Sequence, residues 1–167
     1  MSSILKVDQL QDSGGNNLIT SNGSGVITAA GFGKVGQVVH GSTNTQVTIT
    51  SSSLTDTGLS ASITPTSTSS KILVIIAQSL GKNNVNTYSD FYLLRDSTTL
   101  QFIHNNILYN GSTNQNYNEI SATYLDTPSS TSSLNYKTSC NRVGSSGEIR
   151  AQTDSSYSSM ILMEILP

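Results

Sequence analysis

The stretch KILVIIAQ, Lys71 to Gln78, is the most hydrophobic segment of the chain. Its six central residues, Ile72 to Ala77, are all apolar, so an extended strand here would have no polar face. A run this short and this rich in β-branched side chains is typical of a strand rather than a helix. Strands that read as continuous apolar runs are covered on both faces. We therefore expect this segment to be the central strand of a layered β structure, packed on both sides.

Segments on both sides of this strand also have β character. Polar and apolar residues alternate over 45–50, 59–63 and 134–138, and further strand-like segments occur at 91–94, 100–103, 119–125 and 159–166. Pro65 and Pro128 each close a segment, because proline cannot donate to a strand ladder. About eight or nine short strands with turns between them, and no helical period, are typical of a sandwich or barrel. We predict an all-β fold, a jelly-roll-like β-sandwich preceded by a short extended N-terminal β arm.

The last of these segments is apolar on both sides. Met160 to Met163 are four consecutive apolar residues, and Ile165 and Leu166 follow after Glu164. A strand of this kind needs cover on both faces. We expect it in the middle of a sheet or at a subunit contact.

Residues 1–33 have a different character from the rest of the chain. Four apolar side chains stand in an otherwise hydrophilic stretch: Ile4, Leu5, Val7 and Leu10. Two β-prone pieces, 18–20 and 26–28, then flank Asn22-Gly23, which is a hairpin-turn signal. Such a segment is too small for a core of its own, so it is either disordered or completes its packing against other chains. With 29–33 as a glycine-rich linker, we predict an N-terminal arm over 1–33 and a head domain over 34–167.

The composition narrows the classes of partner. Charged residues make up 11% of the chain, the net charge is −2, and Ser and Thr account for about three residues in ten. The eight Lys and Arg residues form no basic stripe, which argues against nucleic acid and against a polybasic membrane patch. No apolar run reaches the ~18 residues that span a bilayer, and the N-terminus lacks the pattern of a signal peptide. We expect a soluble protein made in a cytoplasm, without membrane insertion.

No set of residues has the spacing of a catalytic or metal site. His40 and His104 stand apart from other ligand types, and the single Cys140 has no candidate base beside it. A G-x-S-x-G motif and a phosphate-binding loop are both missing from the sequence. We expect Cys140 to be a buried or half-buried structural thiol. We predict no enzymatic activity, no cofactor and no bound metal.

Aromatic residues concentrate in the middle third of the chain, next to loops rich in asparagine. Tyrosine together with Asn and Ser is typical of adaptable contact surfaces, and aromatic faces also stack on sugars. Tyr88, Tyr109 and Tyr117 are the candidates for such a surface. The alternative, which we favour, is that about half of the tyrosines are core or strand-face residues with hydroxyls at the rim.

Several segments resemble virion proteins of tailed bacteriophages. The opening SSILKVDQLQD and the later LITSNGSGVIT resemble the N-terminal module of tail fibres and related proteins of phages with marine and cyanobacterial hosts. Four further segments are similar to the globular head domain of such proteins, namely SITPTSTSSKILVI, LLRDSTTL, YLDTPSSTSSLNYK and SSMILMEIL. The resemblance covers nearly the whole chain, but its motifs are structural and specify no reaction. Fibres of this kind usually carry a long shaft, whereas here about thirty residues of arm lead directly into the head.

The resemblance implies a non-enzymatic virion component, made in the host bacterial cytoplasm and assembled as a homotrimer, with a short tail fibre as the first hypothesis. The arm would dock on another virion protein of tail or capsid through Ile4, Leu5, Val7 and Leu10. The head would face the host surface, with a glycan as candidate partner of Tyr88, Tyr109 and Tyr117. One alternative is a capsid decoration protein that stabilises the shell; the others are a free carbohydrate-binding module and a small hydrolase. The sequence does not separate the tail fibre from the decoration protein.

Overall fold

The computed structural model describes residues 7–21, 23–24, 27–29, 34–112, 114–144 and 146–167. The chain divides into two compact units, residues 1–34 and 35–167. In the described part, every regular element is a β-strand except one short 3-10 turn, η1 (Thr153–Ser155). The prediction of an all-β fold is confirmed.

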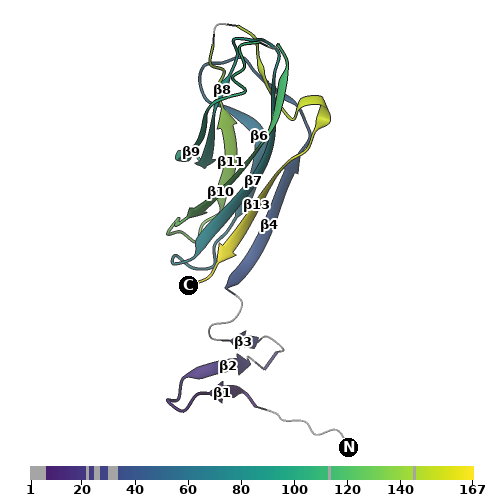
Figure 1. Ribbon diagram of the computed structural model, residues 1–167. Coiled ribbons are helices and arrows are strands. Elements are labelled where there is room, and N and C mark those ends of the chain that lie inside the picture. The colour runs from purple at the N-terminus through teal and green to yellow at the C-terminus, as the bar shows by residue number, and fades with distance from the viewer. Residues whose placement is uncertain (1–6, 22, 25–26, 30–33, 113, 145) are drawn as a thin grey trace, which may run out of the picture. The chain divides into compact units, whose positions relative to one another are not determined.

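The first unit contains a small antiparallel sheet. Its strands are β1 (Gln9–Gln11), β2 (Asn17–Ser21) and β3 (Ile27–Ala29), in that order (Figure 1). Asp12 holds the turn between β1 and β2, because its Oδ1 accepts hydrogen bonds from the backbone N–H groups of Gly14 at 2.8 Å and Asn16 at 2.9 Å. β2 and β3 pair antiparallel, as a hairpin requires. Asn22 of the predicted turn lies outside the described residues.

Apolar side chains of the first unit remain exposed to solvent. The exposed fractions are 56% for Val7, 50% for Leu10, 40% for Leu18 and 38% for Ile19. Short strands whose described apolar side chains face solvent do not make a core. Ile4 and Leu5 of the predicted docking patch, and residues 30–33 of the predicted linker, lie outside the described residues.

The second unit is a sandwich of two antiparallel sheets (Figure 1). The first sheet contains, in spatial order, β4 (Val35–Thr43), β13 (Ser158–Ile165), β7 (Lys71–Lys82) and β10 (Asn116–Asp126). The second sheet contains β6 (Thr55–Ile63), β11 (Leu134–Cys140), β8 (Ser89–Arg95) and β9 (Thr98–Ile107). Two three-residue strands, β5 (Val47–Ile49) and β12 (Ile149–Ala151), extend the first sheet beside the end of β7.

The order of the eight long strands is that of a jelly roll. Along the chain, β8 and β9 are the one consecutive pair of long strands that lie in the same sheet; every other step passes to the opposite sheet. Two interlocked four-stranded sheets of this kind define the jelly-roll sandwich. The predicted fold class is therefore confirmed, with eight long strands and two short ones among the described residues of the second unit.

β7 is the central strand of the first sheet, but the expectation that both its faces are covered is wrong. Its inner side chains are almost fully buried, namely Ile72, Val74 and Ile76. Its outer side chains are only partly buried, namely Leu73, Ile75 and Ala77. The reason is that a two-layer sandwich covers only the inner face of each sheet. The second apolar face of β7 lies on the outside of this chain.

β13 lies between β4 and β7, so the C-terminal strand is in the middle of a sheet, as predicted. Met160 and Leu162 point inward and are completely buried. Ile161 and Met163 point outward and are partly buried. Like β7, this strand carries an apolar outer face.

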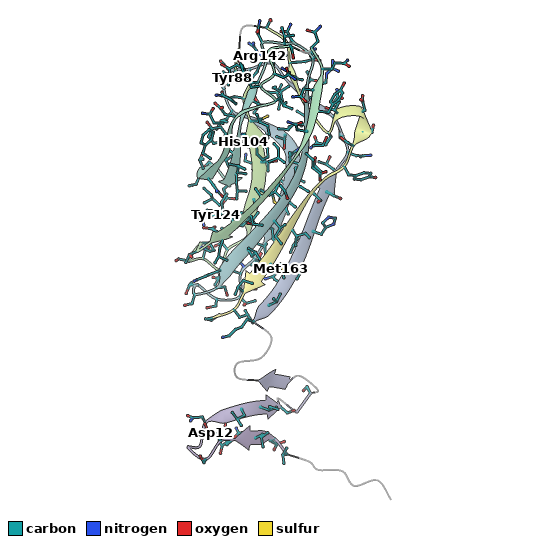
Figure 2. All side chains as sticks on the ribbon, viewed as in Figure 1. Asp12, Tyr88, His104, Tyr124, Arg142 and Met163 are labelled. Carbon is teal, nitrogen blue, oxygen red and sulfur yellow. The ribbon has the colours of Figure 1, made fainter. Side chains whose placement is uncertain are left out.

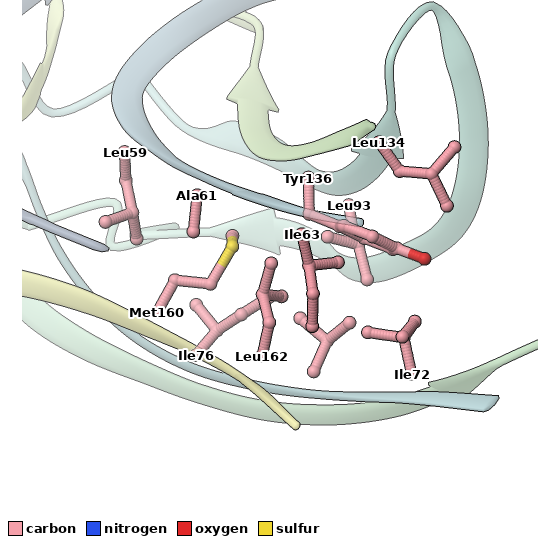
Figure 3. Packing of buried hydrophobic residues seen from close by; sticks show 11 residues of the cluster. Leu59, Ala61, Ile63, Ile72, Ile76, Leu93, Leu134, Tyr136, Met160 and Leu162 are labelled. Carbon is pink, nitrogen blue, oxygen red and sulfur yellow. The ribbon is translucent and has the colours of Figure 1, made fainter. Parts of the chain in front are cut away.

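The core between the sheets has two apolar clusters. Figure 3 shows one of them, in which Met160, Ile76 and Leu162 of the first sheet pack toward residues of the second. The other cluster includes Leu80, Phe91 and Cys140.

A hydrogen-bonded polar layer lies between these two clusters. Thr138 Oγ1 is 2.5 Å from Thr57 Oγ1 and donates to Gln78 Oε1 at 2.9 Å, while Gln78 Nε2 donates to Ser158 Oγ at 3.0 Å. All four side chains are buried. Because each polar group has a partner, the layer crosses the core without leaving a donor orphaned at these positions.

The two sheets approach each other closely at the edge formed by β4 and β6. A Cβ atom on Gly41 would lie 2.2 Å from the carbonyl oxygen of Ser60 and 3.0 Å from the Cβ of Ala61. No residue other than glycine fits this contact without moving the backbone of β6. The opposite edges of the sheets are β10 and β9.

Candidate functional site

A groove lies between β9 and β10, the edge strands of the two different sheets. Its volume is about 580 Å³, within the range of about 300–1,000 Å³ typical of ligand sites. The apolar part of its lining consists of buried side chains, namely Ile107, Leu108 and Ile120. The rest of the lining includes exposed side chains, namely His104, Asn106, Tyr109, Tyr117, Asn118 and Glu119.

Tyr117 is placed by a glycine on the neighbouring strand. Tyr117 of β10 pairs with Gly81 of β7, and a Cβ on Gly81 would lie 2.6 Å from Cδ1 and 3.0 Å from Cε1 of the tyrosine ring. The ring therefore lies against the glycine backbone, an arrangement in which an aromatic residue covers a cross-strand glycine. Tyr117 is 48% exposed and lines the groove.

Tyr109 follows the end of β9 and is 69% exposed. The backbone reaches it through two non-glycine residues with positive φ, Asn106 at 53° and Leu108 at 67°. Leu108 is buried in the second apolar cluster, so packing holds it in a conformation that leucine rarely adopts. Tyr88 packs against Tyr109 edge to face, with 5.6 Å between ring centroids and 80° between ring planes. The Tyr109 ring is thus supported by Tyr88.

A buried lysine fixes the loops that carry these tyrosines. Lys82 is 1% exposed, and its ammonium donates to the carbonyl oxygens of Val85 at 3.1 Å and Asn110 at 2.9 Å. Val85 precedes Tyr88 in one loop, and Asn110 follows Tyr109 in the other. Burial lowers the pKa of Lys82, because removing the ammonium from water penalises its charged form. Lys82 therefore joins the two tyrosine loops without taking part in the groove surface.

The polar side chains at the rim are held by short local contacts. His104 Nδ1 lies 2.8 Å from the carbonyl oxygen of Asn105. The backbone N–H of Asn106 donates to Asp90 Oδ1 at 3.1 Å. The groove thus combines two exposed aromatic rings with imidazole, amide and carboxylate groups. Such a surface can stack on the flat face of a ligand and hydrogen-bond its hydroxyls.

All three tyrosines proposed from the sequence lie in this region. Tyr109 and Tyr117 line the same groove, and Tyr88 contacts Tyr109. Figure 2 labels Tyr88 and also His104, which lines the groove. The residues proposed for virion attachment belong to the other unit, where Val7 and Leu10 are exposed. Their predicted roles remain predictions.

The two histidines and the cysteine lie in different places. His104 lines the groove, whereas His40 lies exposed on the outer face of β4, beside Ile161. Cys140 is completely buried, as expected of a structural thiol, and burial raises its pKa to about 11. Among the described residues, no three His, Cys, Asp or Glu side chains are grouped so that they could hold a metal ion. Within the same residues no helix is long and apolar enough to cross a membrane.

Sequence reasoning missed three residues that shape the groove: Gly81, Lys82 and Leu108. Glycine near the end of an apolar strand is a known signal for close approach of another group, and could have singled out Gly81. Lys82 has the sequence pattern of an ordinary strand end, and its partner Asn110 comes from a loop that is distant in the sequence. Leu108 carries no local signal of positive φ, because leucine gives no preference for that conformation.

The chain matches no protein-family model and no curated protein. Among solved structures, it is similar to the infectious bursal disease virus VP2 subviral particle, with a TM-score of 0.42 and 13% identity over 86% of this chain and 36% of that one. It is also similar to the T13 IBDV viral particle, with a TM-score of 0.45 and 12% identity over 86% of this chain and 38% of that one. The chain thus spans less than two-fifths of the length of these structures. Similarity at this level carries no argument about function.

Proposed function

We propose that this protein is a virion structural protein, a short trimeric tail fibre that docks on the particle through its N-terminal unit. The observation that carries the proposal is the contrast between its two units. Residues 35–167 enclose a complete apolar core, whereas the described apolar side chains of the first unit remain exposed. Together with the resemblance to phage fibre proteins, this contrast favours an attachment segment joined to a self-sufficient body.

The first unit supplies what a docking segment needs. Val7 and Leu10 are at least half exposed, and β1 has a free edge because it pairs with β2 alone among the described strands. An exposed strand edge with apolar side chains can add to a sheet or fill a groove on another protein. Ile4 and Leu5 extend the same apolar pattern in the sequence.

The trimer is supported by the outer face of the first sheet. One row of side chains crosses all four long strands, and strand register places in it Val38, Met163, Leu73 and Leu125. Val38 is 57% and Leu125 50% exposed, and the two between them are partly exposed. We call this set the outer apolar row. A contiguous apolar face is typical of a surface that another protein covers, and in this proposal a second copy of the chain covers it.

Removing residues 1–30 tests the attachment role of the first unit. We expect the truncated protein to fold, because its core lies in residues 35–167, and to trimerise but not to join particles. In the full chain, Val7→Asp with Leu10→Asp should have the same effect. Gln9→Asp with Gln11→Asp is the matched control, since it adds the same charge to the same segment without removing apolar surface. Normal incorporation of the truncated form would show that the body carries the attachment.

Gold labelling of the protein on intact particles separates the tail fibre from the capsid decoration protein. Label at the tail is the expected result. Label distributed over the shell would replace the tail fibre by a decoration protein of the same fold, and a particle without label would overturn both.

A further inference from the structure

We propose that the groove between β9 and β10 binds a neutral saccharide, with Tyr109 and Tyr117 as stacking platforms. The inference rests on the proposed function only in its biological role, since it names what the body would recognise on a host surface. Its physical basis is independent of the virion, and consists of the side chains, the charge and the rigidity of the groove.

The two tyrosines expose apolar ring surface to solvent, and a ligand could cover that surface. Tyr109 is 69% and Tyr117 48% exposed, and both line one groove. The flat C–H face of a pyranose ring matches an aromatic face, and tyrosine offers that area with few rotatable bonds to immobilise. A groove with aromatic rings from two segments, β10 and the loop after β9, can hold more than one sugar residue.

The polar groups that line the groove match the hydroxyls of a sugar. Asn106 and Asn118 each offer an amide donor and acceptor, and Glu119 offers a carboxylate acceptor. Sugar hydroxyls both donate and accept, so a mixture of amide and carboxylate groups can satisfy them. A purely apolar ligand would leave these groups without partners, at a cost in binding.

The charge of the groove selects against acidic sugars. Among the described residues that line it, Glu119 carries a negative charge and neither lysine nor arginine occurs. Lys82 lies close by, but it is 1% exposed and its ammonium donates to two backbone carbonyls. A carboxylate or phosphate on the ligand would therefore meet Glu119 without a paired cation. Neutral hexoses and N-acetylhexosamines fit this electrostatic setting.

The groove is preformed, which lowers the entropy cost of binding. Gly81 holds the Tyr117 ring against β7, Tyr88 supports Tyr109, and Lys82 ties together the two loops. Leu108 is kept at a φ of 67° by burial in the core. Gly81, Tyr88 and Lys82 do not line the groove, so they position the rings without touching the ligand, whereas Leu108 is part of the apolar lining.

Saturation-transfer NMR on the purified full chain tests the inference. The probes are methyl glycosides of glucose, galactose, mannose and N-acetylglucosamine, and methyl glucuronide serves as the acidic counterpart of the glucoside. Mannan and dextran form a second arm, which distinguishes a polymeric surface glycan from a free sugar. We expect binding of at least one neutral probe in either arm and at least tenfold weaker binding of the glucuronide. Binding of none of the neutral probes, or preference for the acidic one, would overturn the inference.

Variants connect the binding to the groove. Tyr109→Ala and Tyr117→Ala should each weaken binding about tenfold, which is the loss expected when one aromatic platform is removed. Tyr109→Phe should keep most of the affinity, because it keeps the ring. Tyr157→Ala is the matched control: Tyr157 is 72% exposed and does not line the groove. Equal binding by all four variants would place the sugar elsewhere and refute the site. These measurements use purified protein, so their result does not depend on where the protein lies on a particle. Failure of the saccharide site can therefore be distinguished from failure of the proposed function.

Discussion

Glu164 of β13 is a carboxylate with no exposed surface, yet it is held in its charged form. Burial by itself raises the pKa of this group, but hydrogen bonds outweigh it. Gln37 Nε2 donates to Oε2 at 2.8 Å, and the backbone N–H and hydroxyl of Thr66 donate to Oε1 at 2.7 Å and 2.8 Å. The net effect lowers the pKa of Glu164 to about 2. The carboxylate thus ties β13 to β4 and to the segment after β6.

The first prediction concerns the acid stability of the fold. The pKa of Glu164 is lower in the folded state than its ordinary value of 4.5, so the folded state binds fewer protons. Its contribution to stability is therefore complete above pH 4.5 and lost as the pH falls toward 2. We expect a loss on the order of 1–3 kcal/mol from this group.

Glu164→Gln isolates that contribution from the other carboxylates. The variant should be less stable than the wild type at neutral pH, since an amide nitrogen cannot accept from the donors of Gln37 or Thr66. The difference in free energy of unfolding, measured with urea at a series of pH values, should shrink as the pH falls. A difference that is constant over the whole range would show that Glu164 does not titrate between the two states.

At the scale of single elements, alternation in the sequence identified the strands and the inward face of each. Leu59, Ala61 and Ile63 on β6 and Leu134 and Tyr136 on β11 are buried as their spacing indicates. Local patterns extend no further, because the register between distant strands is set by packing rather than by neighbours in the chain. β7 illustrates the limit: its apolar run predicted the central strand correctly, but suggested a third layer that a single chain does not provide.

The groove shows the same limit. Its tyrosines could be suspected from composition, and all three lie in one region of the structure. Their juxtaposition could not be predicted, since Tyr117 is positioned by Gly81 on another strand and Tyr109 by the packing of Leu108. Both effects arise only when β7 and β10 are paired and the core is closed.

The second prediction compares the two faces of β7. Ile76→Ala removes a side chain that is 1% exposed and should lower the free energy of unfolding by about 2–5 kcal/mol. Ile75→Ala, on the outer face, removes the same atoms from a partly exposed position and should cost less in the isolated chain. Urea unfolding of both variants at a concentration where the protein is monomeric measures the difference. Equal costs would mean that the outer face is as well covered as the inner one.

At the scale of the whole molecule, the outer apolar row is the feature most in need of a partner. The third prediction is that Met163→Lys leaves the fold intact, because the side chain points away from the core, but dissociates the proposed trimer. Sedimentation velocity compares it with the wild type and with Thr98→Lys, an exposed position on β9 in the other sheet. A wild-type protein that sediments as a monomer, or a trimer unaffected by Met163→Lys, would remove the outer apolar row from the proposal.

The contact at Gly41 has a mechanical consequence for the sandwich. Where β4 meets β6, the backbones of the two sheets are in direct contact. This edge of the sandwich is therefore closed, while the groove lies at the opposite edge, between β9 and β10. Substitutions along β9 and β10 can alter the width and chemistry of the groove without disturbing the contact between β4 and β6. Substitution of Tyr109, Asn118 or Glu119 could therefore change the ligand, whereas Gly41 cannot be replaced without moving the backbone of β6.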